Sequence, residues 1–235
     1  MQISQFNSKI LEIIEETPEV KTFVLECPHD FTFIAGQFIM LSFPGEKLAK
    51  AYSISSSPTK KGTIELTIKI EQYPEEELPK HLTPRLGKVE QGQEITIKGP
   101  YGKFILDETK DRFCFLAGGT GIAPLMSMIR YCLDKNLKKH IILINSNKTP
   151  EHIIYKEELA AIKNKIHLVQ TITHPEPGCH HPHHNGRISK ELLNQHLNKQ
   201  AMFYICGPNE MIKQSKAYLL DLEVPQEQIH VELWG

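Results

Sequence analysis

The periodicity of the sequence changes after Phe104. Before it, short stretches rich in β-branched and aromatic residues alternate with turns, and residues 63–69 alternate apolar and polar side chains with period two, as a half-buried strand does. The predicted strands of this part are residues 8–14, 21–26, 37–43, 51–55, 63–69 and 94–98, with one helix over residues 78–86. Closely spaced strands of this kind predict a six-stranded antiparallel barrel over residues 1–106.

The second predicted domain covers residues 107–235. It follows Leu106 and begins within a polar segment, residues 106–111, that we interpret as a linker, and strands and helices alternate after that segment. The predicted strands are residues 113–117, 141–145, 166–171, 202–206 and 231–233, and the predicted helices are residues 122–133, 155–162, 189–196 and 209–220. This alternation predicts a parallel sheet covered by helices. The expected fold class is therefore β + α/β, with the barrel as the first domain and the parallel sheet as the second.

Acidic and basic residues nearly cancel, since 27 Lys and Arg against 28 Asp and Glu give a net charge of −1. Nucleic-acid-binding proteins usually carry a basic excess, so we expect no nucleic-acid partner. No apolar run approaches the roughly 20 residues of a membrane span, and the N-terminus lacks the basic start and apolar core of a secretory signal. These features predict a cytoplasmic chain without a membrane span.

The five cysteines lie far apart and none belongs to a CxxC pair. Their spacing predicts free thiols in a reducing compartment, and it excludes an in-chain plant-type [2Fe–2S] site, which needs four closely spaced cysteines. The residues are Cys27, Cys114, Cys132, Cys179 and Cys206.

Residues 115–124 run from an apolar strand through Gly118, Gly119 and Gly121 into a predicted helix with Pro124 in its first turn. Glycine lets a backbone approach a ligand closely, and a helix N-terminus offers free N–H groups to a pyrophosphate. One interpretation is a pyrophosphate site, and the other is a glycine-rich turn without a ligand.

A second strand-to-helix turn follows Cys206, in the order Cys206-Gly207-Pro208. Ligands of open parallel sheets bind at the carboxyl ends of the strands, so Cys206 is expected to face the same crevice as the glycine segment. The alternative is a small buried thiol at a strand end.

Residues 50–56 of the first half place Lys50, Tyr52 and several hydroxyl groups on one predicted strand. The ring can stack on a flat ligand and the cation can meet a phosphate. A serine-rich edge strand without a ligand is the alternative.

Five motifs follow one another along the chain, and together they resemble the ferredoxin–NADP reductase superfamily, in particular its members without an iron–sulfur domain. The motifs are Lys50-Ala51-Tyr52-Ser53, Gly99-Pro100-Tyr101-Gly102, the glycine segment ending at Pro124, Cys206-Gly207-Pro208 and Glu232-Leu233-Trp234. The likeness spans essentially the whole chain. It implies a flavin-binding barrel followed by a Rossmann-like NAD(P)-binding domain.

The resemblance implies that Tyr52 packs against the isoalloxazine ring and that the Ser53 hydroxyl lies near flavin N5. Lys50 stands where the family has an arginine that pairs with flavin phosphate, and it keeps the charge but loses the bidentate fork. The resemblance places Thr83 at a helix start, where it would hold flavin phosphate. The residues implied to bind flavin are Lys50, Ala51, Tyr52, Ser53, Thr67, Ile68, Lys69, His81, Leu82, Thr83, Thr120 and Trp234.

For the second domain, the resemblance implies that Cys206 lies beside the nicotinamide ring and that Glu232 relays a proton. With Ser53, these two are the implied catalytic residues. The residues implied to bind NAD(P) are Gly118, Gly119, Thr120, Gly121, Pro124, Ser146, Asn147, Cys206, Gly207, Pro208 and Met211.

The expected preference for NADH over NADPH follows from the absence of an arginine. A 2′-phosphate usually attracts an arginine clamp, and no arginine lies between Tyr131 and Gly186. Residues 145–151 resemble the corresponding loop of NADH-using members. We therefore expect NADH, with NADPH as the alternative because Lys148 could meet a phosphate.

A histidine cluster occupies residues 180–184, between a predicted strand and a predicted helix. His180, His181, His183 and His184, with Cys179 and His174 nearby, could bind zinc, nickel or copper. A solvated loop is the favoured interpretation, and we expect no metal site.

The resemblance implies a reductase that transfers hydride from NAD(P)H to bound FAD, or to FMN as the alternative, and then passes electrons to an acceptor. The acceptor would be a ferredoxin-like or flavodoxin-like protein or a small molecule. A second hypothesis is the reductase subunit of a multi-component oxygenase or dehydrogenase; such subunits often carry an iron–sulfur module, and the sequence ends at Gly235 without one. A third hypothesis, a non-catalytic dinucleotide-binding protein, is disfavoured by the presence of all three implied catalytic residues. The sequence pattern indicates neither the acceptor nor the oligomeric state.

Overall fold

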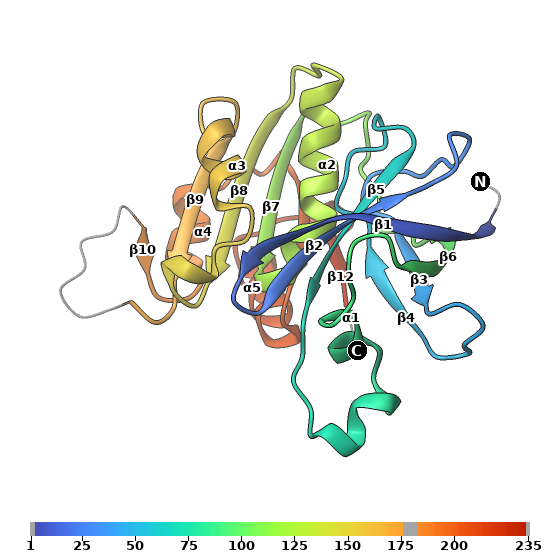
Figure 1. Cartoon of the computed structure of the whole chain (residues 1–235). Helices are drawn as coiled ribbons and strands as arrows, with labels where there is room; N and C mark the ends of the chain where they lie inside the picture. The colour runs from blue at the N-terminus through green and yellow to red at the C-terminus, as the bar shows by residue number, and fades with distance from the viewer. Residues whose placement is uncertain (1–2, 176–182, 234–235) are drawn as a thin grey trace. The chain divides into compact units, whose positions relative to one another are not determined.

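The computed structural model describes residues 3–175 and 183–233 and divides into two compact units (Figure 1). The first unit contains Met1–Leu106 together with Met126–Lys135, and the second contains Asp107–Leu125 and Asn136–Gly235. Each unit has its own sheet and its own hydrophobic cluster.

The strands of the first unit form an antiparallel barrel. They are β1 (Ser4–Thr17), β2 (Val20–Glu26), β3 (Phe38–Ser42), β4 (Ala49–Ser53), β5 (Thr63–Lys69) and β6 (Glu94–Tyr101). Within the described residues they pair in the order β4-β3-β6-β1-β2-β5, and every neighbouring pair is antiparallel. The two ends of this order meet where Ile54, just after β4, bridges Leu66 of β5. The predicted antiparallel barrel is therefore confirmed.

β1 extends beyond its predicted bounds, residues 8–14, at both ends. Its residues 4–9 pair with β6, and its residues 10–17 pair with β2. A register shift between Ile10 and Glu12 marks a bulge where the strand changes partner.

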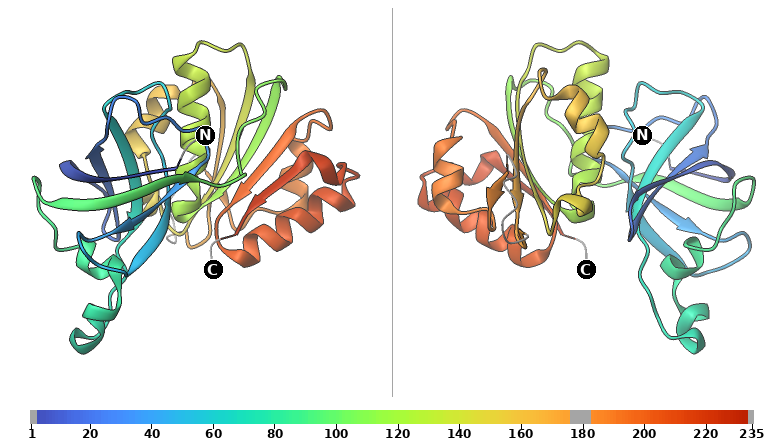
Figure 2. Two further views of the ribbon diagram at one scale, coloured as in Figure 1. Left: turned by 90° about the vertical axis from the view of Figure 1, so that its right-hand side faces the viewer. Right: turned by 60° about the vertical axis from the view of Figure 1, so that its left-hand side comes forward.

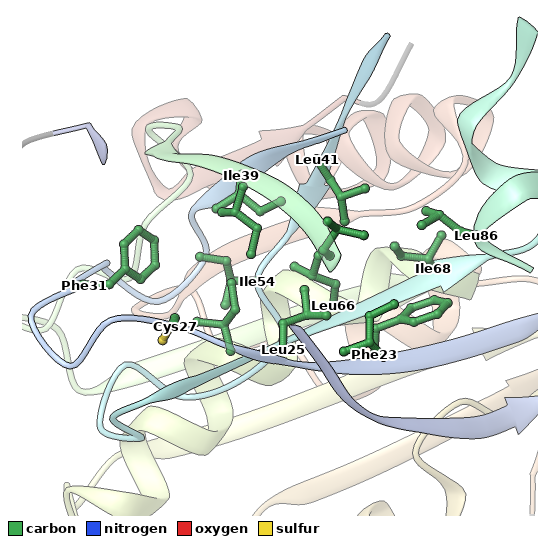
Figure 3. Close-up of a cluster of buried hydrophobic side chains, with 14 of the residues drawn as sticks. Phe23, Leu25, Cys27, Phe31, Ile39, Leu41, Ile54, Leu66, Ile68 and Leu86 are labelled. Carbon is green, nitrogen blue, oxygen red and sulfur yellow. The ribbon is translucent and has the colours of Figure 1, made fainter. Parts of the chain in front are cut away.

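Alternate side chains of these strands fill the barrel. Figure 3 shows Phe23 and Leu25 of β2, Ile39 and Leu41 of β3, and Leu66 of β5 in one buried cluster. Residues two apart on a strand point to the same face, so the period-two pattern of the sequence supplies this core directly.

The single helix predicted over residues 78–86 is wrong, because two short helices replace it. A 3-10 helix covers Glu75–Lys80 (η1) and an α-helix covers Leu82–Leu86 (α1), separated by His81 in an extended conformation. A continuous helix would have placed Pro84 in its interior, where proline loses a hydrogen bond and clashes with the preceding turn. Starting α1 at Leu82 places Pro84 in the first turn, where proline is tolerated.

Helix α2 (Ile122–Asp134) begins in the second unit, and its residues from Met126 onward pack with the first. The Ser127 hydroxyl donates to the Ser56 carbonyl at 2.7 Å. The Arg130 guanidinium donates to the Ser55 carbonyl and to the Glu65 carboxylate, both at 2.8 Å. These bonds attach the helix to β5 and to the connection between β4 and β5.

The second unit is an α/β sandwich. Its strands are β7 (Arg112–Gly118), β8 (His140–Asn147), β9 (His167–Ile172), β10 (His184–Asn185), β11 (Met202–Cys206) and β12 (Ile229–Glu232). Within the described residues they pair in the order β10-β9-β8-β7-β11-β12, and all neighbours are parallel. The predicted parallel sheet is confirmed, and β10 is a strand that the sequence analysis missed.

Helices cover both faces of this sheet (Figure 2). The remaining helical segments are η2 (Gly119–Gly121), η3 (Pro150–His152), α3 (Lys156–Ile162), α4 (Lys190–Gln195), α5 (Asn209–Asp221) and η4 (Gln226–Gln228). Leu192 of α4 and Ile212 of α5 pack with Leu116 of β7, so these two helices share one face of the sheet. The longest helices of the described residues, α2 and α5, have 13 residues each, fewer than the roughly 20 of a bilayer-spanning helix.

Candidate functional site

Most of the predicted NAD(P) residues lie at the carboxyl edge of the parallel sheet. The strand register places Gly118 beside Ser146, Ala117 beside Cys206, and Cys206 beside Glu232. Open parallel sheets bind ligands at this edge.

The turn after β7 packs tightly against the turn after β11. A Cβ on Gly121 would lie 2.3 Å from the Cys206 carbonyl oxygen, and a Cβ on Gly118 would lie 2.6 Å from the Met211 sulfur and 2.9 Å from Cδ of Pro208. The packing of the two turns therefore already accounts for these two glycines, without any ligand.

Gly119 differs from its two neighbours in the same motif. It has φ +53°, a left-handed conformation that favours glycine, and nothing lies within 4 Å of its Cβ position. Its backbone is therefore open to an approaching ligand. Of the other predicted residues, Pro124 is buried in α2, and Thr120 and Ser146 are half-buried.

Glu232 is a half-buried acid next to Cys206. One of its carboxylate oxygens is buried and has no hydrogen-bond partner among the described residues. Burial raises the pKa of this carboxyl to about 7. A group with this pKa can both give and take a proton near neutral pH. Cys206 itself is fully buried.

Further buried polar atoms without a partner among the described residues lie near the ends of β8 and β9. These atoms are the amide nitrogen and oxygen of Asn145, the amide nitrogen of Asn147 and the hydroxyl oxygen of Thr171. All three side chains are buried. Buried polar atoms are normally hydrogen-bonded, so these positions suit a polar ligand or water. Together with the open backbone of Gly119, they fit a dinucleotide at this edge.

The predicted flavin residues of the barrel unit include a polar cluster of side chains. The Lys50 ammonium donates to the Thr83 hydroxyl at 3.1 Å, although 33 positions separate the two residues. The ring of His81 stacks on Tyr73, with the centroids 3.8 Å apart. Lys50 and Thr83 are therefore brought together, as a shared phosphate site requires, whereas the contact of His81 is with Tyr73.

Tyr52 lies next to this cluster on β4. Its hydroxyl is buried and interacts electrostatically with Thr83 and Glu71. Burial raises the pKa of Tyr52 to about 12, so the phenol stays neutral. Ser53, at the end of the same strand, is buried, Ala51 is half-buried, and Leu82 belongs to the barrel core.

The side chains of residues 67–69 point elsewhere. The Thr67 hydroxyl shares a 2.8 Å hydrogen bond with Thr22, Ile68 belongs to the barrel core, and Lys69 forms an ion pair with Glu19 at 3.0 Å. Among the described residues, β5 is the last strand in the order of its sheet, and beyond the bridge at Leu66 one of its backbone edges pairs with no strand. A flavin here would therefore meet the backbone of β5 rather than these side chains.

Two polar residues of the barrel unit were missed by the sequence analysis. The Glu71 carboxylate accepts from the Tyr73 hydroxyl at 3.3 Å and from the Thr83 hydroxyl at 3.1 Å. The signal that could have identified them is the Glu-Gln-Tyr segment, residues 71–73, soon after a predicted strand. The buried Asn145 lies in the segment 145–151 that resembles NADH-using members but is not among the predicted NAD(P) residues, although a polar residue at the end of an otherwise apolar strand would have indicated it.

The predicted Trp234 contact and most of the histidine cluster, including Cys179, His180 and His181, lie outside the described residues. The described histidines nearby include His167 and His196, whose rings share a 3.1 Å hydrogen bond. Within residues 3–175 and 183–233, no group of three or more His, Cys, Asp or Glu side chains could hold a metal ion.

Two known domain families match this chain, one in its N-terminal part and one in its C-terminal part. Residues 7–105 match the oxidoreductase FAD-binding domain, and residues 115–217 match the oxidoreductase NAD-binding domain. The two matches follow the order of the two units.

Similar proteins of known name include a reductase subunit and a flavohemoprotein. The chain is 30% identical to the glycine betaine monooxygenase reductase subunit of Chromohalobacter salexigens, over 97% of this chain and 64% of that protein. It is 29% identical to a flavohemoprotein of Oceanobacillus iheyensis, over 97% of this chain and 58% of that protein. The chain thus spans less than two thirds of the length of these relatives.

Solved structures share the fold. The ferredoxin NADP+ reductase from Neisseria gonorrhoeae, with bound FAD and NADP, superposes with a TM-score of 0.82 at 26% identity, covering 97% of this chain and 98% of that one. The ferredoxin reductase in carbazole 1,9a-dioxygenase superposes with a TM-score of 0.87 at 20% identity, covering all of this chain and 70% of that one.

Proposed function

Because this chain belongs to the ferredoxin–NADP reductase superfamily, we propose that it is an NAD(P)H-dependent flavoprotein reductase that passes electrons to an acceptor. When bound, the flavin supplies the chemistry, by accepting hydride from the nicotinamide and releasing electrons to the acceptor. The observation that carries the proposal is the pairing of Cys206 with Glu232 at the carboxyl edge, directly beside the glycine turn after β7.

The residues of the α/β unit would bind and orient the nicotinamide dinucleotide. Gly119 leaves a backbone surface open for the pyrophosphate, and the partnerless atoms of Asn145 and Asn147 would bond the bound nucleotide or its water. Cys206 would position the nicotinamide ring, and the Glu232 carboxyl would hold or release a proton beside it.

The residues of the barrel unit would hold the flavin. Lys50 and Thr83 donate hydrogen bonds suited to a phosphate, and the Tyr52 ring offers an apolar surface to a flat ligand. Ser53 would place a hydroxyl at the reacting end of the ring system. FAD is the proposed flavin, since the matching domain is an FAD-binding one.

NADH is the proposed reductant. Arg130 and Arg187 bracket a stretch without arginine, and this stretch contains β8 and β9, whose ends would meet the adenosine. Comparison of kcat/KM for NADH and NADPH tests this choice, and a preference for NADPH would contradict it.

The decisive experiment adds NADH anaerobically to the flavin-loaded protein and follows flavin absorbance. Rapid bleaching is expected, and ferricyanide should restore the colour. Cys206→Ala should slow the bleaching far more than it lowers flavin content. A protein that takes up no flavin would end the proposal.

A second candidate function is the reductase component of a monooxygenase. It is favoured by the 30% identity to a glycine betaine monooxygenase reductase subunit over 97% of this chain. In that case the acceptor is an oxygenase protein rather than a diffusible carrier. Co-purification from the native source distinguishes the two, because a stable oxygenase partner would elute with the chain.

A further inference from the structure

One carboxylate oxygen of Glu71 accepts from three donors of the barrel unit, which are Lys50, Tyr73 and Thr83. We call these four residues the barrel cluster. The Lys50 ammonium lies 3.3 Å from Oε2, the Thr83 hydroxyl 3.1 Å and the Tyr73 hydroxyl 3.3 Å. Lys50 and Thr83 are the same two residues that the resemblance assigns to flavin phosphate. A carboxylate therefore already occupies the donors that a phosphate would use.

The carboxyl of Glu71 is ionised at neutral pH. Burial acts to raise its pKa, but the charge of Lys50 and the hydrogen bonds from Lys50, Thr83 and Tyr73 outweigh burial and leave the pKa below its usual value. The negative charge of Glu71 thus offsets the positive charge of Lys50 within the cluster. The side chains of Lys50 and Glu71 are 44% and 43% exposed, so water and salt reduce this effect without removing it.

Two flavins present different charges to such a cluster. The phosphate of FMN is a monoester whose second pKa lies near 6, so close to two negative charges sit on one phosphorus at neutral pH. The two phosphates of FAD are joined by a pyrophosphate (phosphoanhydride) bond, and each carries a single charge. Repulsion by a neighbouring carboxylate is therefore stronger for FMN than for either phosphate of FAD.

We propose that Glu71 is a specificity-determining residue that disfavours the terminal phosphate of FMN and so selects FAD. The inference rests on the proposed function, since it requires that the barrel unit binds a flavin. Beyond that function, the inference names the residue, Glu71, whose negative charge favours FAD over FMN.

The test compares three ligands on the flavin-free protein. Riboflavin, FMN and FAD are titrated and quenching of flavin fluorescence gives each Kd, with riboflavin as the probe that lacks phosphate. The wild type should bind FAD more tightly than FMN. In Glu71→Gln the affinity for FMN should rise about fivefold relative to that for FAD, the size expected for half-exposed charges, while the Kd of riboflavin stays constant.

Two further variants separate charge from shape. Glu71→Asp keeps the carboxylate and should keep the preference for FAD. Glu76→Gln, an exposed acid of η1, is the matched control and should change none of the three affinities. Thermal melting of each variant establishes that it is folded.

The inference is overturned if Glu71→Gln changes FMN and FAD binding equally, if it weakens all three flavins, or if Glu71→Asp loses discrimination as Glu71→Gln does. If the wild type binds none of the flavins, the proposed function fails as well. Flavin binding without discrimination by Glu71 leaves the proposed function standing and removes only this inference.

Discussion

The two candidate sites hold their polar groups in opposite ways. In the barrel unit, Lys50, Glu71 and Thr83 bond to one another at a half-exposed surface. In the α/β unit, Asn145 and Glu232 keep buried polar atoms without a partner among the described residues. A ligand of the first cluster must replace existing bonds, whereas a ligand of the second supplies missing ones.

The largest expected effect concerns the backbone of the sheet-edge site. Gly121→Ala should lower the free energy of unfolding by about 3 kcal/mol or more, because the new Cβ would lie 2.3 Å from a backbone carbonyl oxygen that cannot move aside alone. Gly119→Ala meets no atom within 4 Å and has only its φ of +53° to accommodate, so about 1 kcal/mol is expected. Urea unfolding of both variants checks the order, and equal midpoints would contradict the tight packing of the two turns.

The next largest effect is the pH dependence of stability that Glu232 of the α/β unit produces, which is opposite in sign to that of Glu71 in the barrel unit. The pKa of Glu232 is raised to about 7 in the folded chain, above its ordinary value of 4.5, so the folded state holds the proton more strongly than the unfolded state does. The resulting stability is fully present below pH 4.5 and is lost as the pH rises through 7. Glu232→Gln should therefore match the wild type near pH 5 and exceed it at pH 8 by on the order of 2 kcal/mol. Unfolding measured across this range tests the sign, and a wild type that gains on the variant as pH rises would refute it.

Two buried threonines compare a hydroxyl that forms hydrogen bonds, in Thr67, with one that has no hydrogen-bond partner among the described residues, in Thr171. The Thr67 hydroxyl bonds to Thr22 and Ser55, so Thr67→Val should cost about 1–2 kcal/mol of unfolding free energy. The buried Thr171 hydroxyl has no partner among the described residues, so Thr171→Val should be neutral or stabilising by up to about 1 kcal/mol in the nucleotide-free protein. Denaturant melts give both values, and the same sign for both would show that the sheet edge is already satisfied.

The smallest expected effect belongs to Glu71. Its pKa is lowered, so its contribution to stability is present above the pKa of the unfolded chain and is lost as the pH falls through the folded-state value, the reverse of Glu232. Because both partners are more than a third exposed, Glu71→Gln should cost less than about 1 kcal/mol at pH 7. Thermal melts at pH 7 and pH 3 check this, and a larger loss at the lower pH would contradict the assigned direction.

Much of the fold follows from local pattern. Period-two alternation along residues 63–69 predicted β5, and the apolar strand before Gly118 predicted β7 and the turn that follows it. The predicted helix over residues 78–86 is wrong because Pro84 is not tolerated in the interior of a continuous helix, so α1 begins only at Leu82. β10, only two residues long, carries too little pattern to be predicted.

Motif order along the chain predicted residues for both candidate sites, from Lys50 and Tyr52 to Cys206 and Glu232, because those motifs are local runs of sequence. Folding determines which of these residues meet and in what electrostatic state. Glu71 reaches Lys50 and Thr83 only when β4, β5 and α1 come together, and Glu232 gains its raised pKa only when β12 pairs with β11. Hydrogen bonds and desolvation act between atoms that are close in space, and the linear order of residues specifies neither distance nor burial.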